Sequence, residues 1–194
     1  MRIVLIILVA VIAIFLGYVA SRPSQMHIER STTIAAAPAA VYAEVADFHQ
    51  WDKWSPWDKY DPHMQKSYSG DAGAVGSSYE WTGNNKVGTG AVILTAAQPP
   101  ARLEYRLEFR KPMQAVNSAV FAFAPEGAGT KVTWSMDGKN NFLAKFFGVF
   151  MDVDKLVGGD FETGLASLKQ LSEAGGAAAP GAAHADSAAA APAK

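Results

Sequence analysis

The chain has 194 residues, a formal net charge of −1 at pH 7 and no cysteine. Disulfides, thiolate metal sites and cysteine nucleophiles are therefore excluded. Acidic and basic residues are interspersed rather than gathered into a basic stripe, so we expect no nucleic-acid partner. Both ends differ in composition from the middle, which predicts an N-terminal segment over 1–22, one domain over 23–173 and a disordered Ala/Gly/Pro-rich tail over 174–194.

The N-terminal segment is uncharged and apolar from Ile3 to Ala20. About 18 helical residues rise about 27 Å, enough to cross the hydrocarbon core of a bilayer. A cleaved signal peptide is the alternative, but this run is longer than the usual apolar region, and Tyr18 would occupy the −3 position for cleavage after Ala20. We predict an uncleaved single-pass anchor (3–20), with the N-terminus cytoplasmic and the domain outside, in the periplasm of a Gram-negative host.

The domain begins with a predicted strand, His27–Ile34, and a helix that opens at Ala37-Pro38, because proline suits the first helical turn. Aromatic rings then recur every three residues, a spacing typical of a helical or 3₁₀ turn. Two interpretations remain open: the rings close one end of the core, or Trp54 and Trp57 line the mouth of a pocket. The four rings are Phe48, Trp51, Trp54 and Trp57.

Period-two patterns dominate the next stretch. Over Arg102–Arg110, apolar and charged residues alternate strictly, which predicts a sheet with one dry face and one wet face. Short connections favour antiparallel neighbours. In chain order, the remaining predicted strands are Met64–Ser69, Ser77–Trp81, Gly88–Ala97, Gln114–Ala124 and Lys131–Asp137.

A long amphipathic helix is predicted from about Asn141 to Glu173, with apolar residues at three- or four-residue steps. Gly158 and Gly159 lie in its middle, where each glycine costs about 1 kcal/mol relative to alanine. A kink, or the close approach of another group, would explain both. The apolar face of this helix must cover the dry face of the sheet, which predicts an α+β domain with a curved antiparallel sheet wrapped around the helix.

Three stretches resemble a known family: AAAPAAVYAEVADFHQWDKWSPW, SYEWTGNNKVGTGAVIL and GGDFETGLASLKQLSE. They are similar to segments of the SRPBCC superfamily, the helix-grip group that contains START lipid-transfer domains and the birch-pollen allergen, and in particular to its polyketide cyclase/dehydrase-like branch. The likeness covers about residues 27–173. It implies an apolar pocket between the sheet and the last helix, and it carries over no catalytic residue.

Large apolar residues on the dry faces are the candidates for lining such a pocket. Tryptophan and tyrosine add a polar atom that can orient a ligand. The predicted lining residues are Trp54, Trp57, Tyr79, Trp81, Tyr105, Phe121, Trp134, Phe150, Val157 and Phe161.

Polar clusters give no catalytic or metal motif. Alternation sends Glu80 and Asp137 to the wet face, and the acids of WDKWSPWDKYDPH alternate with lysines that would repel a cation. We predict no metal and no cofactor. Three functions follow: a membrane-anchored binder of a hydrophobic small molecule or lipid; a polyketide cyclase- or hydratase-like enzyme acting on an apolar substrate; or an interaction module without a ligand.

Overall fold

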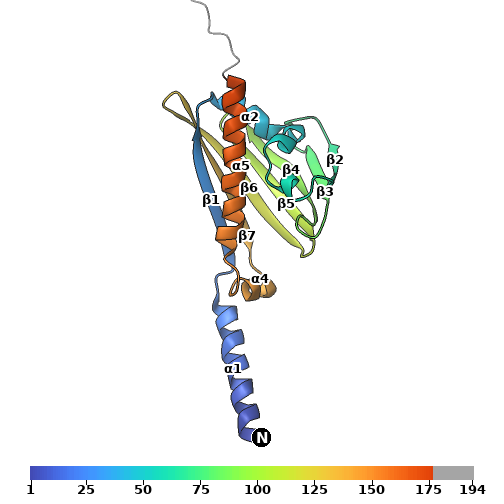
Figure 1. Cartoon of the computed structure of the whole chain (residues 1–194), viewed down its shortest axis with the longest axis vertical. Coiled ribbons are helices and arrows are strands. Elements are labelled where there is room, and N and C mark those ends of the chain that lie inside the picture. The colour runs from blue at the N-terminus through green and yellow to red at the C-terminus, as the bar shows by residue number, and fades with distance from the viewer. Residues whose placement is uncertain (177–194) are drawn as a thin grey trace, which may run out of the picture.

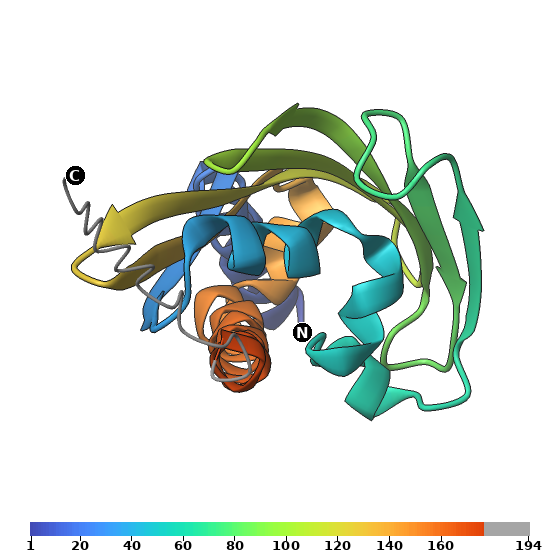
Figure 2. The ribbon, with the colours of Figure 1, turned by 90° about the horizontal axis from the view of Figure 1, so that it is seen from above.

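The computed structural model describes residues 1–176 and shows one curved antiparallel sheet with helices on its concave side (Figures 1 and 2). The predicted α+β helix-grip fold is therefore confirmed. Residues 177–194 of the predicted tail, including His184, lie outside the described residues. The helices are α1 (Arg2–Ser21), α2 (Pro38–Ala46), the 3₁₀ helix η1 (Phe48–Lys53), α3 (Trp57–Tyr60), α4 (Phe142–Phe147) and α5 (Val153–Gly176).

Within residues 1–176 the sheet has seven strands in the order β1-β7-β6-β5-β4-β3-β2. Each predicted strand is present, with its ends shifted by at most a few residues. The strands are β1 (Gln25–Ile34), β2 (Gln65–Ser69), β3 (Ser78–Thr82), β4 (Thr89–Gln98), β5 (Arg102–Lys111), β6 (Ala115–Glu126) and β7 (Gly129–Lys139).

The antiparallel order sets which turns share an end of the sheet. β1 starts, and β7 finishes, at the end that also carries the β3–β4 turn (83–88) and the β5–β6 turn (112–114). We name this the anchor end, because α1 leads into β1 and α4 follows β7 there (Figure 1). The β2–β3 turn (70–77) lies at the opposite, far end.

The predicted single C-terminal helix is two helices, which corrects the sequence analysis. Polar side chains start both: Asn141 accepts a hydrogen bond from the Ala144 amide at 2.8 Å, and Asp152 accepts one from the Lys155 amide at 3.0 Å. Such caps favour helix starts. Gly148 ends α4, between these two caps. The three- to four-residue spacing of apolar residues continues through both helices, so the sequence pattern did not show the break.

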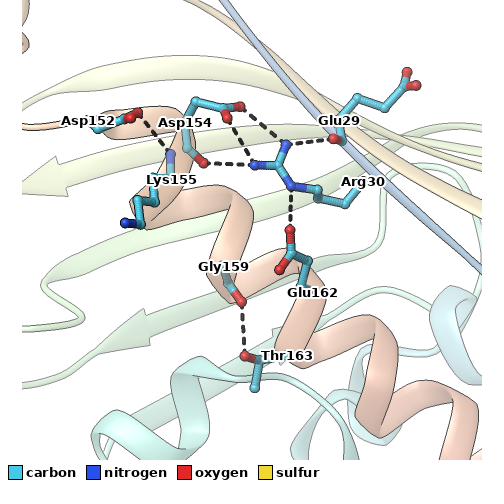
Figure 3. A network of polar contacts seen from close by, with 8 residues as sticks. All are labelled: Glu29, Arg30, Asp152, Asp154, Lys155, Gly159, Glu162 and Thr163. Atoms are coloured by element: carbon cyan, nitrogen blue, oxygen red, sulfur yellow. Dashed lines mark hydrogen bonds and ion pairs between the residues drawn. The ribbon is translucent and has the colours of Figure 1, made fainter.

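An ionic network fixes the start of α5 over β1 (Figure 3). The Nε of Arg30 on β1 lies 2.7 Å from Glu162, and its Nη2 lies 2.9 Å from Asp154. The guanidinium passes directly over Gly158, where a Cβ would meet Nη2 at 2.1 Å. Close approach therefore explains Gly158, which lies within the continuous helix α5.

Candidate ligand-binding cavity

A cavity of about 340 Å³ lies between the concave face of the sheet and the helices. Its walls come from β3 to β7, from the segment 51–64 and from α5. Buried rings form the inner part, and its rim includes Lys86, Lys111 and Met113 in or beside the two turns at the anchor end. The cavity is therefore mainly apolar inside, with Lys86 and Lys111 exposed at the rim.

Paired large and small residues in neighbouring strands create this space. Tyr105 on β5 lies opposite Ala119 on β6, and Phe109 lies opposite Ala115. The two alanines lack the volume to fill the gap beside the rings. On the next strand pair, a Cβ at Gly90 would lie 2.4 Å from the Trp81 ring, so glycine there is what lets this ring lie across the sheet.

Stacked rings build the wall toward α5. The Trp134 and Phe161 rings are parallel within 6° with centroids 4.0 Å apart, and Phe121 stacks on the other side of Trp134 at 4.6 Å. Trp57 meets the same indole edge-on at 5.7 Å. Aromatic pairs of this kind stabilise the wall by about 0.5–1.5 kcal/mol each beyond the area they bury.

Most of the polar side-chain atoms of the rings along the cavity already have a hydrogen-bond partner in the protein. The buried Tyr105 hydroxyl donates to the Val45 carbonyl at 2.8 Å, and the Trp81 indole donates to the Val87 carbonyl at 3.0 Å. The Tyr79 hydroxyl has only the Met64 sulfur, at 4.0 Å. Burial raises the pKa of both tyrosines, so their phenols stay neutral.

Asp160 is the one carboxylate among the residues that the structure places along this cavity, and no histidine is among them. It is half-buried and accepts a hydrogen bond from the Tyr60 hydroxyl at 2.5 Å. The cavity thus offers no paired carboxylates and no histidine for acid–base chemistry in the described part of the chain.

Most predicted lining residues meet at this cavity, and two do not. Trp54 is 1% exposed and belongs to the core, where its indole donates to the Glu44 carbonyl at 3.2 Å. Phe150 is 68% exposed and lies beside α1 instead. The predicted residues that line the cavity are Trp57, Tyr79, Trp81, Tyr105, Phe121, Trp134, Val157 and Phe161.

The aromatic run therefore divides between the two interpretations. Trp54 closes the core, whereas Trp57 lines the cavity. Trp51 also lines it, which the sequence analysis missed. Leu107, Phe109 and Met136 also line the cavity. The alternation of apolar and polar residues along β5 and β7 puts all three on the dry face, so the sequence contained the information needed to predict them. The rim residues had no such signal, because their place depends on how far the sheet curls.

The remaining polar candidates lie outside the cavity. Glu80 and Asp137 are exposed on the wet face, as predicted, and they pair with Arg110 at 3.1 Å and with His27 at 2.7 Å. Asp52 and Asp58 belong to the segment in which acids and lysines alternate. Both contact Lys66, which lies on β2. These acids therefore serve as partners for a lysine from the sheet.

Fold and cavity together define a helix-grip domain built around a ligand-sized space. A family model described as polyketide cyclase / dehydrase and lipid transport matches residues 25–173. The chain belongs to this family, within the SRPBCC superfamily. No curated protein matches the sequence.

Solved structures share the fold at low identity. Protein CV1439 from Chromobacterium violaceum has 16% identity and a TM-score of 0.56, with 78% of this chain and 99% of that chain covered. The Aha1 dimer from Colwellia psychrerythraea has 21% identity and a TM-score of 0.55, with coverages of 77% and 98%. The di-domain ARO/CYC StfQ from the steffimycin biosynthetic pathway has 12% identity and a TM-score of 0.57, with coverages of 78% and 52%.

Proposed function

We propose that the domain binds a hydrophobic small molecule or lipid in the cavity between the sheet and α5. The observation that carries this proposal is the cavity of about 340 Å³, apolar within and charged at its rim. Ligand sites typically measure about 300–1,000 Å³ and combine apolar walls with a few polar groups. Transferring an apolar ligand from water into such a space is favourable by about 25 cal/mol per Å² of apolar surface buried.

We further propose that α1 holds this domain at a membrane. The helix has 20 residues, and an 18-residue window within it has a mean hydropathy of 3.2, which is long and apolar enough to cross a bilayer, although a signal sequence would meet the same description. The rim residues lie at the anchor end, the end nearest to α1. A cavity tethered in this way meets membrane amphiphiles at high effective concentration. In the proposed topology the N-terminus is cytoplasmic and the domain is outside.

Catalysis is the second candidate, because the Tyr79 hydroxyl is one buried polar group at the cavity with only a weak partner. A neutral phenol there could donate a hydrogen bond to a carbonyl oxygen of an apolar substrate, as in a cyclase- or hydratase-like reaction. Binding is the better supported function, since the residues described along the cavity include no histidine and only one carboxylate, Asp160, which already accepts a hydrogen bond from Tyr60. A Tyr79→Phe variant separates the two.

The test of binding uses the full chain in amphipol and cis-parinaric acid, a fluorescent fatty acid that accepts energy from tryptophan. Trp57, Trp81 and Trp134 line the cavity and serve as donors. We expect saturable energy transfer that oleate competes away. Ala119→Leu adds three carbon atoms to the cavity wall and fills part of the space, so it should weaken binding at least about ten-fold, the effect of losing about 1.4 kcal/mol.

The matched control is Ala122→Leu, three residues further along β6 and on its other face, where the residue does not line the cavity. This variant should bind like the parent chain. Equal, non-saturable transfer in the parent and both variants would mean that the probe only partitions into the amphipol or onto α1, and the binding proposal would then be wrong.

A further inference from the structure

The largest exposed apolar cluster of the domain itself lies in and just after α4. Five large side chains between residues 142 and 151 are 41–68% exposed. Exposed large apolar side chains that gather in one segment, instead of being scattered singly, mark an interaction site. We name this cluster the α4 patch; it consists of Phe142, Leu143, Phe147, Phe150 and Met151.

The α4 patch is continuous with α1. The Phe146 ring lies 5.8 Å from the Phe15 ring, and the Phe150 ring lies 6.3 Å from it. Two cations join the elements at the end of α1: Lys145 donates to the Ala20 carbonyl at 3.1 Å, and Arg22 donates to the Gly148 carbonyl at 3.2 Å. Figure 1 shows α4 beside the end of α1, at the anchor end of the domain.

The depth of this contact can be measured along α1. Phe15 precedes the last helical residue, Ser21, by about six residues, which is about 9 Å at 1.5 Å per residue. Rings that contact Phe15 therefore lie about 9 Å below the end of α1, on the side of the anchor. Interfacial helices bury their apolar faces by about 5–10 Å into the boundary between head groups and acyl chains.

We propose that the α4 patch is embedded in the interface of the same bilayer that α1 spans, so that the domain is held by two membrane contacts. This inference rests on the proposed anchor. Lys145 and Arg22 lie at the level where α1 ends, which suits cations that extend toward lipid head groups. A lipid surface is the favoured occupant because Phe150 of the patch contacts Phe15 of the apolar helix α1.

A second contact restricts how the domain can tilt about the short connection between α1 and β1. It sets the anchor end of the sheet against the bilayer, with the β3–β4 and β5–β6 turns on the same side. Met113, in the second turn, is 46% exposed and also lines the cavity. The two-point contact thereby brings the cavity rim toward the membrane surface.

The chain has no cysteine, so single cysteines can be introduced and spin-labelled in the full chain. The chain is reconstituted into nanodiscs of phosphatidylcholine and phosphatidylglycerol, and collision with oxygen, which concentrates in lipid, is compared with collision with a water-soluble nickel chelate. The test sites are Leu143→Cys and Phe147→Cys. Leu8→Cys reports on α1, and Val75→Cys, equally apolar and 60% exposed at the far end, is the aqueous control.

We expect Leu143 and Phe147 labels to favour oxygen over nickel, as the Leu8 label does, and the Val75 label to show the reverse. Nickel-accessible labels at 143 and 147 with a lipid-exposed Leu8 label would overturn the inference and leave the anchor intact. Labels at 143 and 147 shielded from both agents would also overturn it, in favour of a protein contact. A nickel-accessible Leu8 label would overturn both the anchor and this inference. None of these readouts involves the cavity, so ligand binding is tested separately.

Discussion

The Arg30 guanidinium occupies the space that a side chain at Gly158 would need. An ideal Cβ at this glycine would lie 2.1 Å from Nη2 and 2.4 Å from Cζ of the arginine. Asp154 and Glu162 hold the guanidinium in place from the same helix. The start of α5 is thus fixed over β1, at one edge of the sheet, which leaves the concave face of β3 to β7 free to form the cavity.

Gly158→Ala should therefore destabilise the domain. The added methyl must displace Arg30 from its acidic partners, and such overpacking costs about 1–3 kcal/mol. Gly159→Ala is the matched control, because nothing lies within 4 Å of a Cβ there; it should stabilise α5 by up to about 1 kcal/mol. Urea unfolding followed by circular dichroism measures both. Equal effects of the two alanines would contradict this account of the glycine pair.

Trp81→Leu should change ligand affinity more than stability. The Trp81 ring is half-buried and lines the cavity, so shortening it enlarges the space and removes contact area from the ligand. We expect about ten-fold weaker binding of cis-parinaric acid with a loss in unfolding free energy of about 1 kcal/mol or less.

Trp54→Leu should give the opposite result. This ring is 1% exposed and does not line the cavity, so the variant loses packing and leaves the Glu44 carbonyl without its donor. We expect a destabilisation of about 3 kcal/mol and near-normal affinity per folded molecule. If Trp81→Leu were the more destabilising of the two, Trp81 would belong to the core instead.

His27 and Asp137 face each other across β1 and β7, and their hydrogen bond raises the pKa of His27 above 6.5. A raised folded-state pKa means that the pair stabilises the fold fully below the unfolded pKa, and that this contribution is lost as the pH rises through the folded pKa. Histidine resonances in NMR titrations should show the shift. Asp137→Asn should return the His27 midpoint toward 6.5; an unchanged midpoint in that variant would rule out Asp137 as the cause.

Tyr79→Phe distinguishes binding from catalysis. Burial raises the pKa of the Tyr79 phenol, so the hydroxyl remains protonated at neutral pH and its removal changes no charge. We expect affinity for cis-parinaric acid to stay within about two-fold, because the bond to the Met64 sulfur is weak. If the parent chain turns over an apolar substrate and Tyr79→Phe abolishes turnover while binding persists, the enzyme proposal takes precedence.

Alternation along the strands was enough to predict the sheet and most of the cavity wall. The faces of Arg102–Arg110 and Lys131–Asp137 were set by a period of two, and Tyr105 and Trp134 lie at the cavity accordingly. The sequence did not reveal that Trp54 lies in the core while Trp57 lines the cavity. A three-residue period shows that rings lie on one side of a helical turn, but it does not show which part of the protein that side contacts.

The break between α4 and α5 was hidden for a related reason. Phe146 and Phe150 continue the apolar period of α5, yet their rings contact Phe15 of α1. Periodicity identifies an apolar face but not its partner. The rim residues Lys86 and Lys111 were also missed, because their position follows from the curvature of the sheet, which no local pattern encodes.

An apolar ligand that occupies the cavity, as we propose, lies beside Trp134 and Phe161. Photo-cross-linking tests this most directly: cells producing the full chain are fed a diazirine-bearing palmitic acid, irradiated, and the adducts are mapped by mass spectrometry. We expect adducts on cavity residues of β3, β5, β6 and β7, with Ala119→Leu removing most of them and Ala122→Leu none. Adducts confined to α1 and α4 in all three chains would show lipid contact without occupancy of the cavity and would contradict the claim.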